Sequence, residues 1–397
     1  MKILLVNNHH SKVGGAETVY FNTIDLLLES GHEVVTLSRK NEYTIKSGAK
    51  EYFIEYSGSL LDRMYSSEAK KQIEKIIEIE KPQVAHLHNT VGGITFSVLP
   101  SLKNAGIPVV MTIHDFRILC PAGLFLNRKN EICEKCGNGN YLHCISNNCS
   151  RNGFLSSVGI SLETFIRNKM IPLNDYCDHL IFVSNFTKAK FLEHFGNIKI
   201  GDSVIHNPVT IEKPNQKRGN YFLYVGRLAQ EKGVITLLKT FAEIPETELH
   251  IVGDGPLMKA CKKIAADNVK LLGYLTGSKL REQYENALFT IIPSECYENL
   301  PMTALESFSH SKPVIGSKLG GIPEIIENGS NGFCFDANSV VQLYSIINQC
   351  LKMDDTKYFS MCENSFIAAK KYDRFTYSNK LISLYTEILH KSHSHYE

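Results

Sequence analysis

Four charged side chains in the second half of the sequence follow apolar runs, where the end of a buried strand would place them close together. Arg227 and Lys232 come after the run YFLYV, and two cations at such a turn could neutralise a diphosphate leaving group. Glu298 and Glu306 come after the run LFTIIPS. Eight residues at about 100° each leave two positions about 80° apart around a helix, so both carboxylates could address one ligand. Two exposed glutamates without a role are the alternative.

Backbone groups beside these side chains could add to the same site. Gly226 directly precedes Arg227, while Asn299 and Leu300 directly precede an expected helix. Amides at a helix N-terminus lack partners within the helix and favour a phosphate. We therefore expect the amides of Asn299 and Leu300 to point at one. A further glycine-rich turn, residues 320–324, follows the run PVIGS.

The first half of the sequence offers a glycine pair and a histidine in comparable places. Gly14 and Gly15 open an expected helix after the first apolar run, so amides there could meet a phosphate or a sugar hydroxyl. A turn that merely needs glycine is the alternative. His114 ends the run VVMTIHD, and its imidazole could hydrogen-bond a sugar hydroxyl or stabilise developing charge. A purely structural histidine is the alternative.

The elements that must position these residues alternate along the chain. With 397 residues the chain is too long for one hydrophobic core, so two domains are expected. Short β-rich runs alternate with amphipathic stretches, which predicts an α/β fold with parallel sheets. We expect two Rossmann-like, doubly wound domains facing across a cleft, at 1–206 and 221–372. Residues 207–220 are rich in Pro, Asn and Lys and predict a linker, and 373–397 predict a terminal helix.

The second domain is expected to contain five strands. Ligands bind open α/β sheets at the carboxyl ends of the strands, and each motif residue above follows such a run closely. The five predicted strands are YFLYVGRL, ELHIVGDG, VKLLGYL, LFTIIPS and PVIGS.

A cluster of cysteines interrupts the first domain. Five of the eleven cysteines lie in the insertion 120–149. The spacing of Cys133, Cys136, Cys144 and Cys149 suits a tetrahedral structural zinc. Unligated thiols or a redox pair are the alternatives. The insertion follows His114, so we expect it to shape the acceptor side and not to perform chemistry.

Composition excludes some classes of partner and leaves one open. Lys and Arg total 43 against 41 Asp and Glu, which lacks the basic excess of a nucleic-acid-binding protein. No signal peptide or run of about 20 apolar residues is visible, so we expect a cytoplasmic protein. The segment 154–173 has apolar residues at helical spacing together with Arg167 and Lys169, and could make peripheral contact with a membrane. A helix packed on its own sheet is the alternative.

Taken together, these motifs resemble the retaining family-4 glycosyltransferases of the GT-B fold. The resemblance rests on Glu298 and Glu306, on Gly226-Arg227 with Lys232, and on the turn 320–324. It extends over nearly the whole chain, because the Gly14-Gly15 pair and His114 fall in the family's order. The resemblance also implies that the last helix returns to the first domain.

The resemblance implies a role for each matched position. Arg227 and Lys232 would hold the donor diphosphate, Glu306 would bind the ribose hydroxyls, and Glu298 would contact the transferred sugar. The other implied contacts are His114 beside that sugar, Gly15 under the donor, and the amides of Asn299 and Leu300 at its phosphates. Many members of the family carry a glycine- or phenylalanine-containing turn where this sequence has Asn299-Leu300-Pro301.

The expected function is transfer of a sugar from a nucleotide-diphosphate donor to a polysaccharide or a lipid-linked glycan. The family's reaction retains the anomeric configuration and would need neither an enzymic nucleophile nor a cofactor. An epimerase acting on nucleotide-sugars and a non-catalytic nucleotide-sugar-binding subunit are the alternatives.

Overall fold

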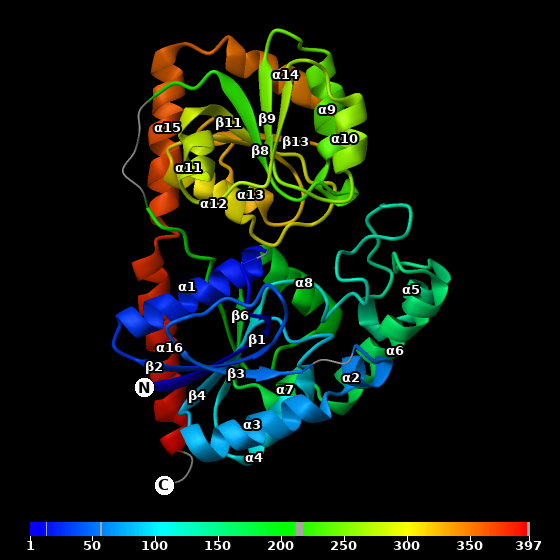
Figure 1. Cartoon of the computed structure of the whole chain (residues 1–397), viewed down its shortest axis with the longest axis vertical. Coiled ribbons are helices and arrows are strands. Elements are labelled where there is room, and N and C mark those ends of the chain that lie inside the picture. Colours follow the sequence, from blue (N-terminus) through cyan, green and yellow to red (C-terminus); the bar gives the residue numbers. More distant parts are fainter. Residues whose placement is uncertain (13, 56–57, 212–216, 395–397) are drawn as a thin grey trace. The chain divides into compact units, whose positions relative to one another are not determined.

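The computed structural model describes residues 1–12, 14–55, 58–211 and 217–394 (Figure 1). These residues form two compact units. The first comprises Met1–Pro208 and the chain from Arg374 onward, and the second comprises Val209–Asp373. The predicted linker 207–220 includes residues 212–216, which lie outside the described residues.

The first unit is built on a parallel sheet that has seven strands among the described residues. Their order is β3-β2-β1-β4-β5-β6-β7. The strands are β1 (Lys2–His9), β2 (Glu33–Arg39), β3 (Lys50–Ile54), β4 (Val84–Leu87), β5 (Val109–Ile113), β6 (His179–Phe182) and β7 (Gly201–Val204). The central strands are buried along their length, as expected when helices cover both faces of a parallel sheet.

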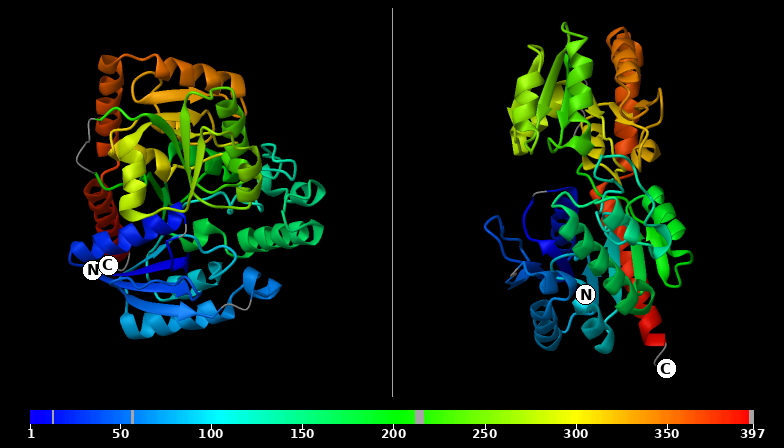
Figure 2. Two further views of the ribbon diagram at one scale, coloured as in Figure 1. Left: turned by 45° about the horizontal axis from the view of Figure 1, so that its top comes forward. Right: turned by 90° about the vertical axis from the view of Figure 1, so that its right-hand side faces the viewer.

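Helices of the first unit cover this sheet (Figures 1 and 2). Helix α3 shows why they form: Ala69, Ile73 and Ile76 recur at helical spacing on its buried side, and the Ser66 hydroxyl caps its start by accepting the amide of Ala69. The helices are α1 (Gly15–Glu29), α2 (Leu60–Met64), α3 (Ser67–Glu80), α4 (Leu99–Asn104), α5 (Leu142–Ser146), α6 (Phe154–Met170), α7 (Leu173–Tyr176), α8 (Asn185–Phe195) and α16 (Arg374–Ser394).

The terminal helix α16 packs against the first unit by specific hydrogen bonds. The hydroxyl of Tyr377 lies 2.8 Å from that of Thr23 on α1, and the hydroxyl of Tyr385 lies 2.6 Å from Nδ1 of His86 on β4. Because Tyr377 and Tyr385 are buried, these contacts fix the register of α16 against the sheet.

The second unit has six parallel strands among the described residues, in the order β10-β9-β8-β11-β12-β13. They are β8 (Tyr221–Val225), β9 (Glu248–Val252), β10 (Val269–Gly273), β11 (Ala287–Ile292), β12 (Val314–Ser317) and β13 (Gly332–Phe335). The helices are α9 (Val234–Ala242), α10 (Met258–Ile264), α11 (Gly277–Asn286), α12 (Met302–Ser309), α13 (Ile322–Ile325), α14 (Val340–Leu351) and α15 (Asp355–Lys370).

Both sheets confirm the predicted α/β class, and the second corrects the predicted number of strands. Five strands were expected there, and β13 is the sixth. It has only four residues and lies in a stretch rich in Gly and Asn, so its apolar run is too short to stand out. In both sheets the chain turns from one winding direction to the other beside the first strand, at β1 and at β8. Ligands bind doubly wound sheets at this switch point.

Candidate active site

The residues expected to do chemistry in the second unit meet at the carboxyl ends of β8 and β11. Nζ of Lys232 lies 2.6 Å from Oε1 of Glu298, and the Ser294 hydroxyl donates to the same oxygen at 2.6 Å. Lys232 follows β8 and Glu298 follows β11, which are neighbouring strands. The switch point of this sheet thus carries a paired lysine and carboxylate.

The two members of this pair hold each other in their charged forms. Burial alone would lower the pKa of Lys232, but attraction to Glu298 outweighs it and the pKa lies above its usual value. Burial alone would raise the pKa of Glu298, yet Lys232 and the Ser294 hydroxyl lower it. The side chains are only 32% and 15% exposed, so the attraction is weakly screened. A fixed ammonium group is therefore present near neutral pH.

Glycines allow the loops around this pair to pack backbone against backbone. Gly320 has φ +63°, and a Cβ there would overlap the backbone of Glu298. The amide of Gly321 donates to the Glu298 carbonyl at 2.6 Å. Gly233 has φ +67°, and a Cβ there would overlap the carbonyl of Pro293. The glycine-rich turn 320–324 thus positions Glu298 directly.

Arg227 lies on the loop that follows β8. Its side chain is exposed, and its carbonyl accepts the Tyr224 hydroxyl at 2.9 Å. The loop behind it approaches closely at Gly253, where a Cβ would overlap the Gly226 carbonyl. The amide of Gly226 donates to Val252. Gly226 and Arg227 are therefore held at the switch point by backbone contacts, and Arg227 is exposed there.

Glu306 lies on α12 and is linked to a different partner. Its carboxylate accepts the hydroxyl of Tyr284 at 2.7 Å. Burial raises the pKa of Glu306, and the bond from Tyr284 lowers it only in part. Glu298 and Glu306 thus have opposite shifts in pKa, because only Glu298 has a cation beside it. A carboxyl group in the position of Glu306 is suited to accept hydrogen bonds from hydroxyls.

Helix α12 starts after Asn299 and Leu300. The helix begins at Met302 with Pro301 as its cap, so Asn299 and Leu300 lie before it and not in its first turn. Proline suits this position because it lacks the amide that a helix start leaves unpaired. The Leu300 side chain is buried. Amides of the first turn therefore belong to residues after Pro301, and contact of the Asn299 and Leu300 amides with a phosphate stays a prediction.

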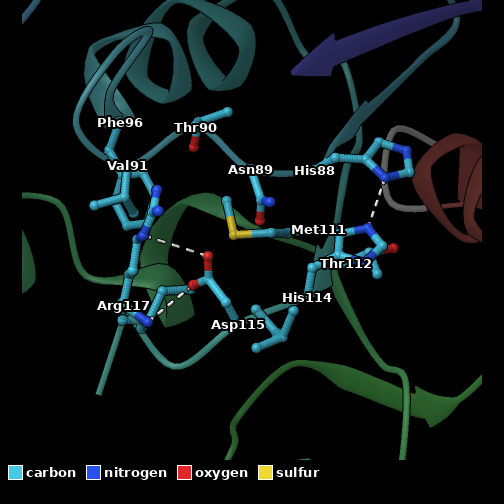
Figure 3. A pocket seen from close by; sticks show the side chains of 12 residues that line it. His88, Asn89, Thr90, Val91, Phe96, Met111, Thr112, His114, Asp115 and Arg117 are labelled. Carbon is cyan, nitrogen blue, oxygen red and sulfur yellow. Dashed lines mark hydrogen bonds and ion pairs between the residues drawn. The ribbon is translucent and has the colours of Figure 1, made fainter. Parts of the chain in front are cut away.

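Three histidines lie at the carboxyl ends of β4 and β5 in the first unit. Nδ1 of His88 lies 2.8 Å from Nε2 of His114, and their rings stack at 14° with centroids 5.1 Å apart (Figure 3). The ring of His86 lies 4.3 Å from that of His88. His86 in turn contacts Thr112 at 2.7 Å through Nε2. His114 thus forms the end of a buried chain of imidazoles.

These imidazoles are neutral near pH 7. Burial lowers the pKa of His114 to about 3, and burial together with the charge of His114 lowers the pKa of His86 to about 3. Burial also puts the pKa of His88 well below its usual value. In each neutral ring, one nitrogen carries a proton and can donate a hydrogen bond, and the other nitrogen can accept one. His114 is suited to hydrogen bonding, and a cationic role is disfavoured.

The histidine chain predicts a loss of stability in mild acid. A histidine with a lowered folded pKa binds fewer protons when folded than when unfolded, so the free energy of unfolding falls as pH drops below the unfolded pKa of roughly 6.5. Each buried histidine contributes up to about 1.4 kcal/mol per pH unit. We expect urea unfolding at pH 7, 6 and 5 to show this decline. The free energy of unfolding should depend less steeply on pH in His86→Asn than in the wild type. The control His390→Asn replaces an exposed histidine and should keep the wild-type slope. Equal slopes in the wild type and both variants would contradict the prediction.

A small pocket beside His114 is lined by one acidic and one basic residue. It is lined in part by Asn89, Thr90, Asp115 and Arg117 (Figure 3). Arg117 pairs with Asp115 at 3.5 Å, and its amide donates to the same carboxylate at 2.9 Å. The pocket thus presents amide, hydroxyl and charged groups next to a neutral imidazole. Such a set can bind hydroxyl groups.

The glycine pair lies at the start of α1 in the same unit. Gly15 is the first residue of α1 and Gly14 is its cap, while residue 13 lies outside the described residues. Both glycines are exposed. Gly14 has φ −146°, an extended value open to any residue, so backbone conformation does not require a glycine there. The charges of Asp115 and Arg117 act on Glu17 in the first turn of α1, which places this turn near the pocket.

Four contributors to these sites were not predicted from the sequence. Ser294 and Tyr284 position Glu298 and Glu306, and His86 and His88 support His114. Tyr284 lies on α11, and nothing in the residue pattern shows that this helix meets α12. His86 and His88 carried a signal, because they alternate in the run VAHLHN next to a buried strand.

The cysteines of the insertion 120–149 gather within the first unit. Cys136 and Cys144 are buried and pack with Tyr141, and Cys149 packs against them. Burial first, and neighbouring thiolates second, raise the pKa of Cys136 and Cys149 to about 12. The charge of Cys120 acts on both, so a fifth thiol belongs to the cluster. Among the described residues, no three or more His, Cys, Asp or Glu side chains are arranged to hold a metal ion.

Zinc at Cys133, Cys136, Cys144 and Cys149 therefore stays a prediction, and binding would require the thiols to rearrange and lose protons. Metal analysis of the purified chain should give about one zinc per chain if the site forms. Cys136→Ser should lower the zinc content, and the buried Cys261→Ser of the second unit should retain it. If the chain contains no zinc when it is produced in zinc-supplemented medium, the remaining interpretations of the cysteines are unligated thiols or a redox pair.

None of the described helices is both long enough and apolar enough to span a membrane.

Comparison with known proteins gives a consistent result over both units. Residues 13–213 match the family model Glycosyltransferase Family 4, and residues 209–366 match the model Glycosyl transferases group 1. An uncharacterised glycosyltransferase of Methanocaldococcus jannaschii is 29% identical over 200 residues, which are 49% of this chain and 55% of that protein. An uncharacterised 42.6 kDa protein in the cps region of Klebsiella pneumoniae is 26% identical over 358 residues, 82% of this chain and 87% of that protein.

Solved structures agree on the fold. The crystal structure of HepE from Anabaena in complex with UDP has a TM-score of 0.69 and 18% identity, and the match covers 98% of this chain and 100% of that one. The two parallel sheets and the likeness to these solved structures show the GT-B fold of glycosyltransferases. Within that class, the chain belongs to Glycosyltransferase Family 4.

Proposed function

We propose that this protein is a retaining hexosyltransferase that moves a sugar from a nucleotide-diphosphate donor to a polysaccharide or a lipid-linked glycan. The observation that carries the proposal is the ion pair of Lys232 with Glu298 at the switch point of the second sheet. It supplies a fixed cation for the leaving diphosphate beside a carboxylate that could contact the transferred sugar. Exposed Arg227, at the end of the same strand, supplies a second cation.

The second unit is proposed to bind the donor. Two cations at the end of β8 favour the diphosphate most as negative charge develops on the leaving group. Glu306 accepts a hydrogen bond from the Tyr284 hydroxyl at 2.7 Å, and its carboxylate is proposed to accept hydrogen bonds from the ribose hydroxyls as well. Because the relative HepE was crystallised with UDP, uridine diphosphate sugars are the first donors to test.

His114 of the first unit is proposed to hydrogen-bond the transferred sugar. Its lowered pKa keeps the ring neutral, and His88 fixes the orientation of the ring through the 2.8 Å contact. Gly15 at the start of α1 is proposed to lie under the donor. Retention would follow if the acceptor attacks on the face from which the diphosphate leaves. That route needs no enzymic nucleophile, so Glu298 is assigned to contact and charge stabilisation.

All eleven cysteines are free thiols, which favours a reducing compartment. We therefore propose a cytoplasmic site of action.

The proposal is tested by donor binding followed by transfer. Nucleotide-sugars should be screened for thermal stabilisation, since a ligand that binds only the folded state raises the melting temperature. The stabilising donor, carrying a labelled sugar, is then incubated with and without glycan acceptors. Label in the acceptor supports transfer. A changed sugar without acceptor would indicate an epimerase, and binding without turnover under any acceptor would indicate a non-catalytic subunit.

Turnover is expected to persist in excess chelator, because Arg227 and Lys232 are proposed to do what a divalent cation does in other transferases. The assay compares initial rates with EDTA and with added magnesium. A zinc ion bound by the cysteines would be structural, so melting temperature is followed in the same samples. Activity lost in EDTA and restored by magnesium alone, at constant melting temperature, would contradict the metal-independent mechanism.

A further inference from the structure

Helix α6 turns its polar side inward and its apolar side outward. The buried residues of this helix are Ser157, Ser161, Glu163, Thr164 and Arg167. Its exposed large hydrophobic residues are Phe154, Leu155, Leu162, Phe165 and Met170. A surface helix of a globular protein shows the opposite arrangement, with its apolar stripe on the core. We call the side that carries the five exposed residues the outer face of α6.

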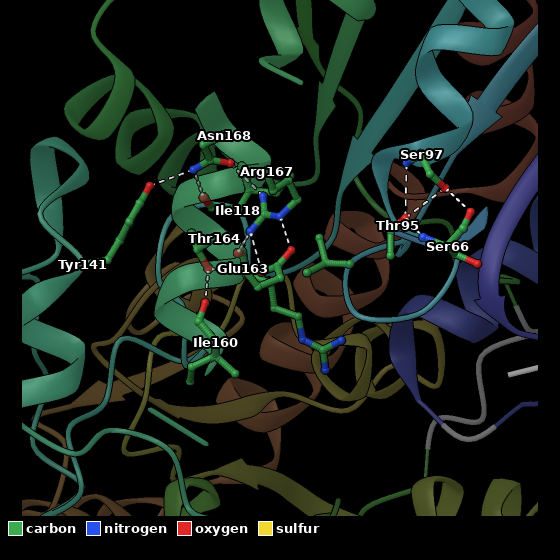
Figure 4. A network of polar contacts seen from close by, with 12 residues as sticks. Ser66, Thr95, Ser97, Ile118, Tyr141, Ile160, Glu163, Thr164, Arg167 and Asn168 are labelled. Atoms are coloured by element: carbon green, nitrogen blue, oxygen red, sulfur yellow. Dashed lines mark hydrogen bonds and ion pairs between the residues drawn. The ribbon is translucent and has the colours of Figure 1, made fainter. Parts of the chain in front are cut away.

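Specific polar contacts hold the inner side of α6 in place. Nε of Arg167 donates to Glu163 at 2.7 Å, and Nη2 donates to the Arg117 carbonyl at 3.0 Å (Figure 4). Nδ2 of Asn168 donates to Tyr141 at 2.7 Å and to the Ile118 carbonyl at 3.2 Å. Turning the helix over would break this network and remove the donors that Arg167 and Asn168 supply to the Arg117 and Ile118 carbonyls. The outer face is therefore fixed in its outward direction.

The helices next to α6 also carry exposed apolar residues. Helices α2 and α5 both contact α6, and Figure 1 shows them beside it. Leu61 on α2 is 77% exposed and Leu142 on α5 is 71% exposed, while Leu155 on the outer face is 84% exposed. Large exposed apolar residues gathered on neighbouring elements favour a surface that binds a partner or a membrane.

Basic residues predominate in α6 and in the segment that precedes it. Residues 135–170 contain four basic residues, Lys135, Arg151, Arg167 and Lys169, and one acidic residue, Glu163. Glu163 and Arg167 are buried in their own ion pair, so only cations remain exposed in this stretch. Nζ of Lys169 lies 5.7 Å from the ring centroid of Phe165, which places a cation directly beside the apolar residues. Anionic lipid headgroups over an apolar layer complement both features.

We propose that the outer face of α6 docks on an anionic lipid surface, with the helix lying in the plane of the interface. Arg167 and Asn168 bind the carbonyls of Arg117 and Ile118, and these residues line the pocket of His114. Docking thus anchors the segment that forms this pocket. Resting on the proposed function, this selects a lipid-linked glycan as the acceptor class.

The chain contains no tryptophan, so Leu155→Trp creates a single fluorescent probe on the outer face. Vesicles of phosphatidylethanolamine with roughly one third phosphatidylglycerol should shift its emission to the blue, and brominated lipids should quench it. The matched control is Val341→Trp on α14 of the second unit, where Val341 is 78% exposed; it should show neither effect. An unchanged Leu155→Trp spectrum would overturn the proposal.

A sedimentation assay with the full chain tests which residues cause docking. Leu155→Glu with Phe165→Glu should lower the vesicle-bound fraction at least about tenfold, while Val341→Glu should not change it. Arg151→Gln with Lys169→Gln should lower binding to anionic vesicles only. Since the replaced side chains are exposed, melting temperatures should stay equal. Undiminished binding by the double glutamate variant would overturn the proposal, as would a dimer in analytical ultracentrifugation that this variant dissociates.

These measurements need no donor and no turnover, so docking and sugar transfer can fail separately. Insertion of the probe without transfer to any acceptor would leave docking in place and remove the proposed function. Transfer to soluble glycans at full rate without vesicle binding would leave the proposed function in place and remove docking.

Discussion

Replacing Lys232 by alanine should lower the turnover of sugar transfer by about 100- to 1000-fold, the usual effect of removing a group aimed at developing charge. The ammonium group is fixed 2.6 Å from Glu298 and stays protonated because that carboxylate raises its pKa. A leaving diphosphate gains negative charge mainly in the transition state, so the loss should appear in kcat more than in KM. Initial rates over a range of donor concentrations measure this separation.

The matched control for this experiment is Lys239→Ala. Lys239 is an exposed lysine on α9 of the same unit, and its removal changes net charge equally without touching the site. Lys232→Ala leaves Glu298 partly buried without its partner, which costs stability, so melting temperatures must be compared. Arg227→Ala has no such complication, because Arg227 is exposed, and should show a similar loss. Normal rates for both variants would remove the proposed role of the two cations.

The arrangement of the sheets and the place of the site could be read from the sequence because both depend on local patterns. An apolar run followed by a glycine and charged residues marks the end of a buried strand, and parallel strands bring such ends to one edge. Arg227, Lys232 and Glu298 were located in this way. The edge strands β3 (KEYFI) and β7 (GDSV) were not predicted, because they contain charged or polar residues, and β13 (GFCF) was not predicted, because it has only four residues.

Contacts between distant elements left no comparable pattern. The pairing of Tyr284 with Glu306, and of His86 with Tyr385 on α16, depends on how helices pack and not on local spacing. The segment of α6 shows the same limit in another way. Its apolar residues at helical spacing predict a helix, which the structure contains, but spacing alone does not tell which side faces the core. The inward direction of Arg167 and Asn168 follows from the carbonyls of residues 117 and 118, which only the fold brings near.

The second large effect on turnover is expected from a substitution in the glycine-rich turn 320–324, which contacts the backbone of Glu298. Gly320→Ala should lower turnover about 100-fold, the cost of misplacing a catalytic group by about 1 Å. The new Cβ would overlap the backbone of Glu298, so either that residue or the turn must move. Glu298 would then lose its alignment with Lys232, although neither side chain has been changed. The left-handed φ of +63° adds a strain of about 1 kcal/mol for alanine.

A second glycine serves as a matched control that separates displacement of Glu298 from the strain of the left-handed backbone conformation. Gly329 also has a left-handed conformation, with φ +81°, but a Cβ there meets no atom within 4 Å. Gly329→Ala should therefore have the same strain of about 1 kcal/mol and lose some melting temperature, yet keep full turnover. The two variants are compared by calorimetry and by initial rates under saturating donor. Equal activity in both would show that the turn does not position Glu298, whereas a loss confined to Gly320→Ala ties catalysis to the contact between the turn and the backbone of Glu298.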